Sequence, residues 1–178
     1  SLPNYNVFRP CDTRETAAGW YTALTSKTTP TGLVLSRQNL PALEGTGKGA
    51  LKGAYVLKDC EGTPDVLLMA SGSEVELIYK AYDELAAKGV KARVISMPCW
   101  ELFEAQDAEY KESVMPKAVR ARLAVEAAAD FGWHKYVGMD GDIICMDGFG
   151  ASAPAGLLFK DFGFTVENVV EKALALVK

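Results

Sequence analysis

The sequence contains a single histidine, His134, and it contains no apolar run of about 20 residues, the length that a membrane-spanning helix needs. The segment Ser1–Tyr5 has neither the basic region nor the apolar core of a signal peptide. Lysines and arginines form no cluster, and the formal net charge is -4. We therefore expect a protein that binds neither a membrane nor a nucleic acid.

The cysteines are few and scattered. The four of them, Cys11, Cys60, Cys99 and Cys145, share no metal-ligand spacing, and only one histidine is available to complement them. A zinc site is therefore not predicted, and no residue is assigned to a metal. Scattered thiols are typical of a reducing compartment, so we expect a cytoplasmic protein.

The second part of the chain alternates strand-like and helix-like segments. About half of all residues are apolar and about a quarter are charged, which is ordinary globular composition. Strands are predicted at 55–57, 65–70, 92–97, 122–126 and 142–146, and helices at about 71–88, 100–114, 154–162 and 166–177. This order predicts an α/β fold with a mainly parallel sheet and helices on both faces.

The first part of the chain holds fewer elements. An extended segment at 7–10 is followed by a helix that Asp12 or Thr13 caps, with Glu15 in the position of a capping box, and that runs to about Lys27. Ala17, Trp20, Tyr21 and Leu24 follow the helical period. Residues 32–35 are predicted to be a buried strand. Elements as few as these cannot bury a core. We therefore expect residues 1–41 to be a partial α/β segment with missing chain upstream, 42–52 to be a linker, and 53–178 to be a complete domain.

Arg37 is the first candidate for a binding residue. The apolar strand at 32–35 ends in Ser36-Arg37-Gln38, and open α/β sheets usually bind ligands beyond the carboxyl ends of their strands. A guanidinium at that place offers a planar fork that can hold a phosphate. The alternative is a solvated arginine at a strand end.

A turn of small residues, Ser71-Gly72-Ser73, is a weaker candidate for an anion site. It joins a strand to a helix, and exposed amides at a helix start can bind an anion. However, it matches neither the dinucleotide fingerprint nor the phosphate loop. Capping of the helix by Ser71 or Ser73 is the role that we favour.

No catalytic residue is assigned. His134 has no obvious nucleophile or partner in the sequence, so we expect a packed or interface histidine, and the aromatic residues around it would suit a subunit contact. Ser152 lies in a loop of small residues and has no visible triad. Four carboxylates are interpreted as the solvated face of a helix: Glu101, Glu104, Asp107 and Glu109.

Several segments, taken together, resemble transketolases from one end of the chain to the other. The most specific are LSRQNLP at 35–41 and GFGASAP at 148–154. The other family-like segments are Pro3-Asn4, Val7–Pro10, Asp12, Glu15-Thr16, the run from Gly53 to Val75, Ser96–Cys99 and Phe162–Val170. By this resemblance, residues 1–41 would close the pyrimidine-binding domain and 53–178 would form the carboxy-terminal domain.

The resemblance implies a ketol transferase of the pentose phosphate pathway that depends on magnesium and thiamine diphosphate. Its substrates would be a ketose phosphate and an aldose phosphate, and the enzyme would be a homodimer. The arginine of the LSRQ segment contacts the substrate phosphate in that family, which by position is Arg37. No Gly-Asp-Gly…Asn-Asn segment for the diphosphate and its metal is found here, so we expect this chain alone to bind no cofactor and to be inactive.

Two alternatives to a fragment of such an enzyme are considered. The chain could be a stand-alone module that binds an anion or assembles subunits, but the partial segment at 1–41 weighs against a purpose-built module. It could also be one subunit of a split enzyme. Such a subunit should retain the whole pyrimidine-binding domain, most of which is missing here.

Overall fold

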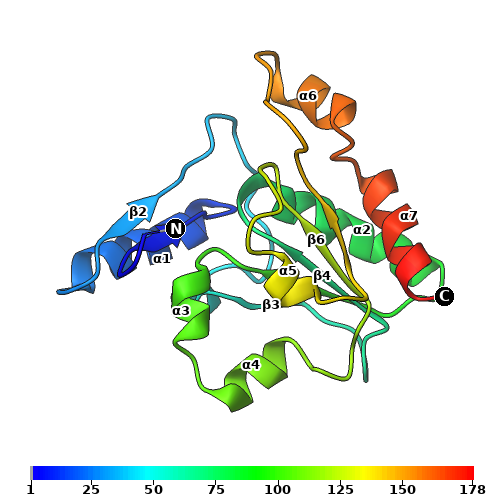
Figure 1. Cartoon of the computed structure of the whole chain (residues 1–178), viewed down its shortest axis with the longest axis horizontal. Coiled ribbons are helices and arrows are strands. Elements are labelled where there is room, and N and C mark those ends of the chain that lie inside the picture. The colour runs from blue at the N-terminus through cyan, green and yellow to red at the C-terminus, as the bar shows by residue number, and fades with distance from the viewer. Residues whose placement is uncertain (1) are drawn as a thin grey trace.

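The computed structural model describes residues 2–178 and contains two separate sheets (Figure 1). The small sheet pairs β1 (Asn6–Phe8) with β2 (Thr31–Leu33) in parallel, and α1 (Thr13–Thr25) connects the two strands. The large sheet has the strand order β3-β5-β4-β6-β7. Its strands are β3 (Tyr55–Lys58), β4 (Val66–Ala70), β5 (Ala92–Ser96), β6 (Arg122–Val125) and β7 (Asp142–Ile144).

The large sheet is mainly parallel, as the sequence predicts. Only the edge strand β3 runs antiparallel to its neighbour β5. The central strand β4 is buried along its whole length, and its alternate residues contribute to two cores. Leu68 packs with α2 (Val75–Ala87) and α7 (Val166–Leu176) in one core, whereas Leu67 and Met69 pack with the helices of the opposite face. The α/β fold class with helices on both faces is therefore confirmed.

Short helices cover the second face and the connections. They are η1 (Lys48–Lys52), η2 (Gly72–Glu74), α3 (Trp100–Glu104), α4 (Ala108–Val114), α5 (His134–Val137) and α6 (Ala155–Asp161), where η marks a 3-10 helix. The single helix expected at 100–114 is wrong, because the backbone of Asp107 is extended and its side chain accepts a hydrogen bond from the Tyr110 amide at 2.7 Å. Asp107 thus caps a second helix instead of continuing the first.

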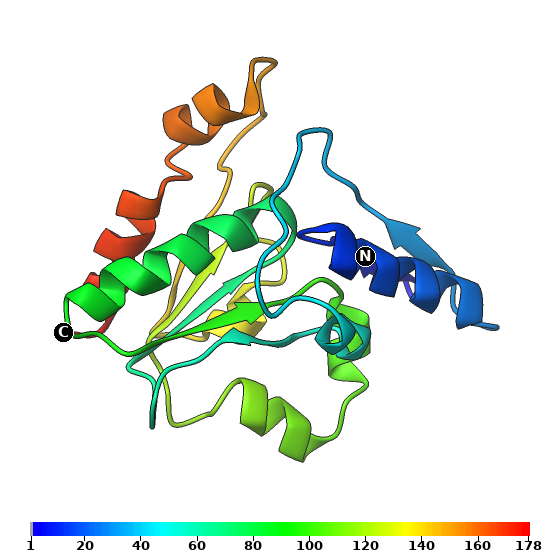
Figure 2. The ribbon, with the colours of Figure 1, turned by 180° about the vertical axis from the view of Figure 1, so that it is seen from behind.

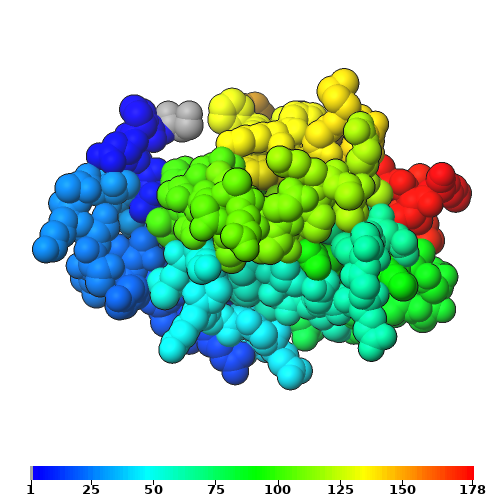
Figure 3. All heavy atoms as spheres, turned by 90° about the horizontal axis from the view of Figure 1, so that it is seen from below, coloured from blue at the N-terminus to red at the C-terminus, as the bar shows by residue number. Residues whose placement is uncertain are grey.

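The first segment packs against the large sheet through backbone and side chains. The Arg9 amide donates to the Pro98 carbonyl at 2.7 Å, and the Gly72 amide donates to the Arg9 carbonyl at 3.0 Å. Figure 3 shows this segment, in blue, at one end of the molecule and in contact with the green part of the chain. β1 therefore lies beside the carboxyl ends of the large sheet's strands.

α1 turns its small and polar residues, rather than its aromatic ones, toward the protein. Its buried residues are Glu15, Ala18, Gly19 and Thr22. A Cβ at Gly19 would lie 3.0 Å from the Phe8 ring, so the helix needs this glycine to approach β1. The apolar set that follows the helical period lies on the outside, with Leu24 79% exposed.

β2 is also less buried than the sequence suggests. The expected strand at 32–35 ends at Leu33, and the side chains of Val34 and Leu35 are each 51% exposed. The small sheet has only two strands and one helix, which cannot cover both faces of β2. The expectation of a buried strand is therefore wrong for the residues that the structure describes.

Gly53 begins the second part of the chain with a backbone that only glycine adopts readily. Its φ is 86°, and a Cβ placed there would lie 2.2 Å from the carbonyl oxygen of Cys99. The close approach allows the Cys99 amide to donate to the Gly53 carbonyl at 3.0 Å. Gly53 thus joins the beginning of β3 to the start of α3.

The carboxy-terminal region extends away from the sheet before it returns. Figure 2 shows α6, in orange, projecting beyond α2 and α7, and α6 has no buried residue. α7 then packs on the sheet through Val169, Val170 and Ala173. None of the helices within residues 2–178 combines the length and the apolar character that a membrane crossing requires.

Candidate functional site

Arg37 lies in an exposed loop that follows β2. No hydrogen bond or ion pair from residues 2–178 engages its guanidinium. Its neighbours Ser36 and Gln38 line a cleft of about 430 Å³, together with Thr13 at the start of α1. Arg37 itself is not among the residues that line this cleft, which contains hydroxyl and amide groups.

The start of α1 forms one wall of this cleft. The Asp12 carboxylate is fully engaged, because one oxygen accepts from the Glu15 amide at 2.9 Å and the other accepts from the Leu43 amide and the Thr46 hydroxyl at 3.2 and 2.6 Å. The amides of a helix start carry partial positive charge. However, Asp12 also lines the cleft, and the Glu15 and Thr16 amides already donate to it.

The side chains of the turn Ser71-Gly72-Ser73 make other hydrogen bonds than the sequence suggests. No side-chain hydrogen bond caps η2 or α2, so the capping role favoured for Ser71 or Ser73 is wrong. The Ser71 hydroxyl instead donates to Glu126 at 3.2 Å and accepts from Arg9 at 3.1 Å, and the Ser73 hydroxyl donates to Glu74. The Gly72 amide donates to a backbone carbonyl, and no hydrogen bond or ion pair among residues 2–178 joins this turn to Arg37.

A buried cluster of charges centred on Arg9 is the main polar feature that the sequence reasoning missed. The guanidinium donates to Glu74 at 3.1 Å and also to Glu126. Glu126 in turn accepts from the indole N–H of Trp133 at 3.1 Å. Burial lowers the pKa of Arg9, but attraction to Glu126 and Glu74 more than offsets this, so the pKa lies above its usual value.

A signal for this cluster was present in the sequence. Arg9 follows β1, Ser71 follows β4 and Glu126 follows β6, so all three are polar residues at strand ends. Strand ends on one edge of a parallel sheet meet in space. What the sequence could not show is that β1, which belongs to the other sheet, lies beside this edge.

A second buried cluster surrounds Glu15. One carboxylate oxygen accepts from the Tyr55 and Ser96 hydroxyls at 2.8 and 2.6 Å, and the other accepts from the Cys11 amide at 2.8 Å. Glu15 thus accepts from the amide of Cys11, the residue before the cap residue Asp12. Its other two partners, Tyr55 and Ser96, lie on β3 and β5. Burial raises the pKa of Glu15, since these hydrogen bonds only partly offset its loss of solvation.

His134 and the helix carboxylates have partners that the sequence did not reveal. His134 is exposed and its Nε2 lies 2.7 Å from Asp130, so of the packed or interface position expected for it, the packed one is wrong and the interface stays a prediction. Glu101 accepts from the Val7 amide at 3.2 Å, and Glu104 accepts from the Tyr136 hydroxyl at 2.9 Å. The nearby aromatic residues Trp133 and Tyr136 belong to the core.

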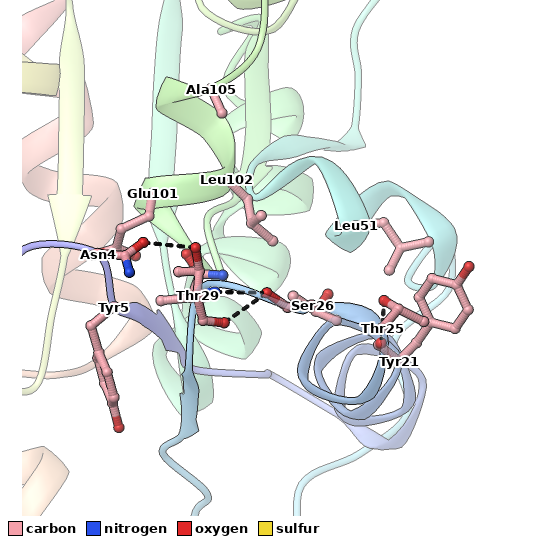
Figure 4. A pocket seen from close by; sticks show the side chains of 12 residues that line it. Asn4, Tyr5, Tyr21, Thr25, Ser26, Thr29, Leu51, Glu101, Leu102 and Ala105 are labelled. Atoms are coloured by element: carbon pink, nitrogen blue, oxygen red, sulfur yellow. Dashed lines mark hydrogen bonds between the residues drawn. The ribbon is translucent and has the colours of Figure 1, made fainter.

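Another hollow lies between α1 and α3. It has a volume of about 590 Å³, and Asn4, Tyr5, Tyr21 and Glu101 are among its lining residues (Figure 4). The Thr29 hydroxyl donates to Asn4 at 2.8 Å, and the Ser26 hydroxyl donates to the Thr29 carbonyl at 2.7 Å. Its polar groups therefore bond to one another to a large extent.

Metal-ligating side chains do not converge in the part of the chain that the structure describes. Within residues 2–178, no three His, Cys, Asp or Glu side chains are placed to hold a metal ion.

A family model for the transketolase-like C-terminal domain matches residues 53–165. Transketolase 1 of Escherichia coli strain K12 is 53% identical over 178 residues, which cover 98% of this chain and 27% of that protein. The chain thus spans about a quarter of the length of the curated relatives that it matches.

Solved structures of transketolases are similar over nearly the whole chain. Transketolase from Leishmania mexicana has a TM-score of 0.93 and 45% identity, over 99% of this chain and 26% of that one. Transketolase from Pichia stipitis, in complex with sedoheptulose-7-phosphate, has a TM-score of 0.92 and 42% identity, also over 99% of this chain and 26% of that one.

Proposed function

The chain belongs to the family of transketolase-like C-terminal domains, and from this premise we propose that the protein of which it forms part is a ketol transferase. That enzyme would move a two-carbon ketol unit from a ketose phosphate to an aldose phosphate. The observation in this chain that supports the proposal most directly is the guanidinium of Arg37, which no hydrogen bond or ion pair within residues 2–178 engages and whose neighbours Ser36 and Gln38 line a polar cleft.

Arg37 is proposed to bind the phosphate of the sugar substrate. A guanidinium with no intramolecular partner can form two parallel hydrogen bonds to a phosphate, and no protein carboxylate has to be displaced first. Sedoheptulose-7-phosphate, which is bound in the complex of the Pichia stipitis transketolase, is a ligand of the proposed class.

Thiamine diphosphate and magnesium would supply the carbanion chemistry when bound. None of the residues 2–178 is assigned to either group, because the Gly-Asp-Gly…Asn-Asn segment expected to hold them is not found in this sequence. This chain's own contribution would be to position the substrate phosphate. By itself it is expected to be inactive.

The division of the chain into 1–41, 42–52 and 53–178 is part of the proposal. Its support is that β1 and β2 form a sheet of their own and that the family match begins at residue 53. The homodimer is likewise inferred from the resemblance. A cytoplasmic location agrees with four free thiols.

The test is Arg37→Ala in the complete enzyme that carries this chain. We expect kcat/KM for phosphorylated substrates to fall, by an amount that corresponds to a loss of about 1.5–3 kcal/mol of transition-state stabilisation, the scale of a charged hydrogen bond. The fall in kcat/KM for unphosphorylated substrates should be far smaller. Arg120→Ala, which removes an exposed arginine elsewhere, is the matched control.

Equal losses for both classes of substrate would rule out the phosphate role of Arg37. The isolated chain, assayed beside the enzyme with thiamine diphosphate and magnesium, should show no ketol transfer. Turnover by the isolated chain would contradict its expected inactivity and favour a self-sufficient catalyst.

A further inference from the structure

The segment that carries Arg37, residues 35–42, leads from β2 toward η1 and lies beside the start of α1. Five of its residues line the cleft of about 430 Å³, together with residues 10, 12, 13 and 16. Within residues 2–178, no hydrogen bond involves any residue of this segment. The hydrogen bonds of this chain that fix the segment are therefore those at its two ends.

Both ends of the segment are attached to the stretch from Phe8 to Arg14. Before the segment, the Val34 amide donates to the Phe8 carbonyl at 2.9 Å, which continues the pairing of β1 with β2. After it, the Leu43 amide donates to a carboxylate oxygen of Asp12 at 3.2 Å, and the Arg14 guanidinium donates to the Leu43 carbonyl at 3.0 Å. One short stretch of chain thus holds the segment on both sides.

The attachment after the segment is buried. Leu43 is 7% exposed and packs in the core of the large sheet. The Thr46 hydroxyl, also buried, donates to the same Asp12 oxygen at 2.6 Å, while the other Asp12 oxygen accepts from the Glu15 amide at 2.9 Å. The carboxylate therefore joins the end of the segment to the first turn of α1. Because these contacts lie inside the chain, they do not depend on which of its surfaces are free.

We propose that Asp12 and Thr46 are positioning residues for the phosphate-binding guanidinium of Arg37, an inference that rests on the function proposed for Arg37. Two parallel hydrogen bonds to a phosphate require a defined direction of the guanidinium, and an arginine on a loosely held segment loses more conformational freedom on binding. Asp12 makes no contact with the phosphate itself, because protein donors occupy both of its oxygens.

The test is Thr46→Val in the complete enzyme that carries this chain, assayed with a phosphorylated and an unphosphorylated ketose. Valine keeps the shape of threonine and removes only the hydroxyl. We expect the KM of the phosphorylated ketose to rise about three- to tenfold, because the guanidinium is less well oriented, with kcat and the KM of the unphosphorylated ketose unchanged. Thr46→Ser retains the hydroxyl and should restore the KM.

Two further variants accompany this test. Thr22→Val makes the same change at another buried threonine, whose hydroxyl donates to the Ala18 carbonyl within α1 at 2.9 Å, and should leave the KM unchanged. Arg14→Met releases the Leu43 carbonyl from an exposed side chain, so it tests the same attachment if Thr46→Val does not fold. It should raise the KM of the phosphorylated ketose alone.

Thr46→Val combined with Arg37→Ala shows whether Thr46 acts through Arg37. We expect the double variant to have the same kcat/KM as Arg37→Ala, because an absent guanidinium cannot be misplaced. The positioning role is overturned if the two losses simply add, if Thr46→Val matches Thr22→Val, or if the KM rises equally for both ketoses.

The two proposals fail in different ways. If Arg37→Ala impairs both ketoses equally, the phosphate role of Arg37 falls and the positioning role falls with it. If Arg37→Ala selectively impairs the phosphorylated ketose while Thr46→Val and Arg14→Met do not, only the positioning role is overturned.

Discussion

Glu15 is a carboxylate that the fold buries without a cation beside it. Its oxygens accept hydrogen bonds from Tyr55, Ser96 and the Cys11 amide, and no ion pair within residues 2–178 includes it. Because burial dominates, the pKa of Glu15 is raised in the folded protein. This single residue links α1 to β3 and β5, so its ionisation bears on how the two parts of the chain are held together.

The raised pKa predicts a specific pH dependence of stability. The folded pKa lies above the unfolded value of about 4.3, so the stabilising contribution is fully present below that value and is lost as pH rises through the folded pKa. Glu15→Gln cannot ionise. We therefore expect the free energy of unfolding of the wild type, minus that of Glu15→Gln, to decrease as the pH is raised from about 4 to 8.

Urea unfolding at a series of pH values measures this difference. Glu109→Gln is the control, because that carboxylate is exposed and its substitution should change stability by less than about 0.5 kcal/mol throughout. A difference for Glu15→Gln that stays constant or grows with pH would contradict a raised pKa.

At the scale of the element, α1 shows how a helix can begin as its sequence predicts and yet bury a different face. Asp12 caps it as expected, through the Glu15 amide. The apolar stripe of Trp20, Tyr21 and Leu24 nevertheless faces outward. Local capping chemistry therefore set the start of the helix, whereas the position of β1 set its orientation.

The two carboxylate oxygens of Asp12 accept hydrogen bonds from different groups. Replacing Asp12 should therefore lower the free energy of unfolding more than the loss of a helix cap alone would. Asp12→Ala removes the cap of α1 and also the acceptor for the Leu43 amide and the Thr46 hydroxyl. We expect the free energy of unfolding to fall by about 2–4 kcal/mol, since a cap contributes about 1 kcal/mol and the Leu43 amide, left unpaired, costs a further 1–3 kcal/mol. The Thr46 hydroxyl keeps the Leu43 carbonyl as its acceptor at 2.8 Å.

Asp107→Ala is the matched comparison for this prediction. Asp107 caps α4 through the Tyr110 amide alone, so its loss should cost only about 1 kcal/mol. Thermal or urea unfolding of the two variants gives the values. Equal costs for both substitutions would show that the bonds of Asp12 to residues 43 and 46 add nothing to stability.

At the scale of the whole molecule, Arg9 is the charge that joins the small sheet to the large one. Its guanidinium pairs with two carboxylates, that of Glu74 in η2 and that of Glu126 directly after β6. Glu74 is fully buried. Removing one partner of a buried ion pair leaves an uncompensated charge, which is usually more costly than the pair itself was favourable.

Arg9→Met is accordingly expected to reduce the free energy of unfolding by about 3–5 kcal/mol. Adding Glu74→Gln should recover part of this loss, because it removes one of the carboxylates that Arg9 had neutralised. Arg120→Met, which breaks the exposed pair with Asp140, should cost less than about 1 kcal/mol.

Urea unfolding of the single and double variants forms the thermodynamic cycle. If the losses from Arg9→Met and Glu74→Gln simply add, the two residues are not coupled. If Arg9→Met costs no more than Arg120→Met, the cluster does not hold the two sheets together.

The sequence alone determined the features that depend on neighbours along the chain. The strand–helix alternation after residue 53, the buried strand at β4 and the cap of α1 follow from local periodicity and local hydrogen bonding, and the structure confirms each of them. The break at Asp107 was also readable locally, because an aspartate at that place is a good cap, but the continuous helical period suggested otherwise. Arg37 was named from its place at a strand end, and its role stays a prediction.

Only the tertiary structure decided which polar groups meet. Arg9 contacts Glu74 and Glu126 across 65 and 117 positions of the chain, and Glu15 contacts Ser96 across 81. Such contacts depend on how the small sheet is placed against the large one, which no local pattern encodes. Burial and pairing are properties of packed surfaces, and packing is decided by the whole chain at once.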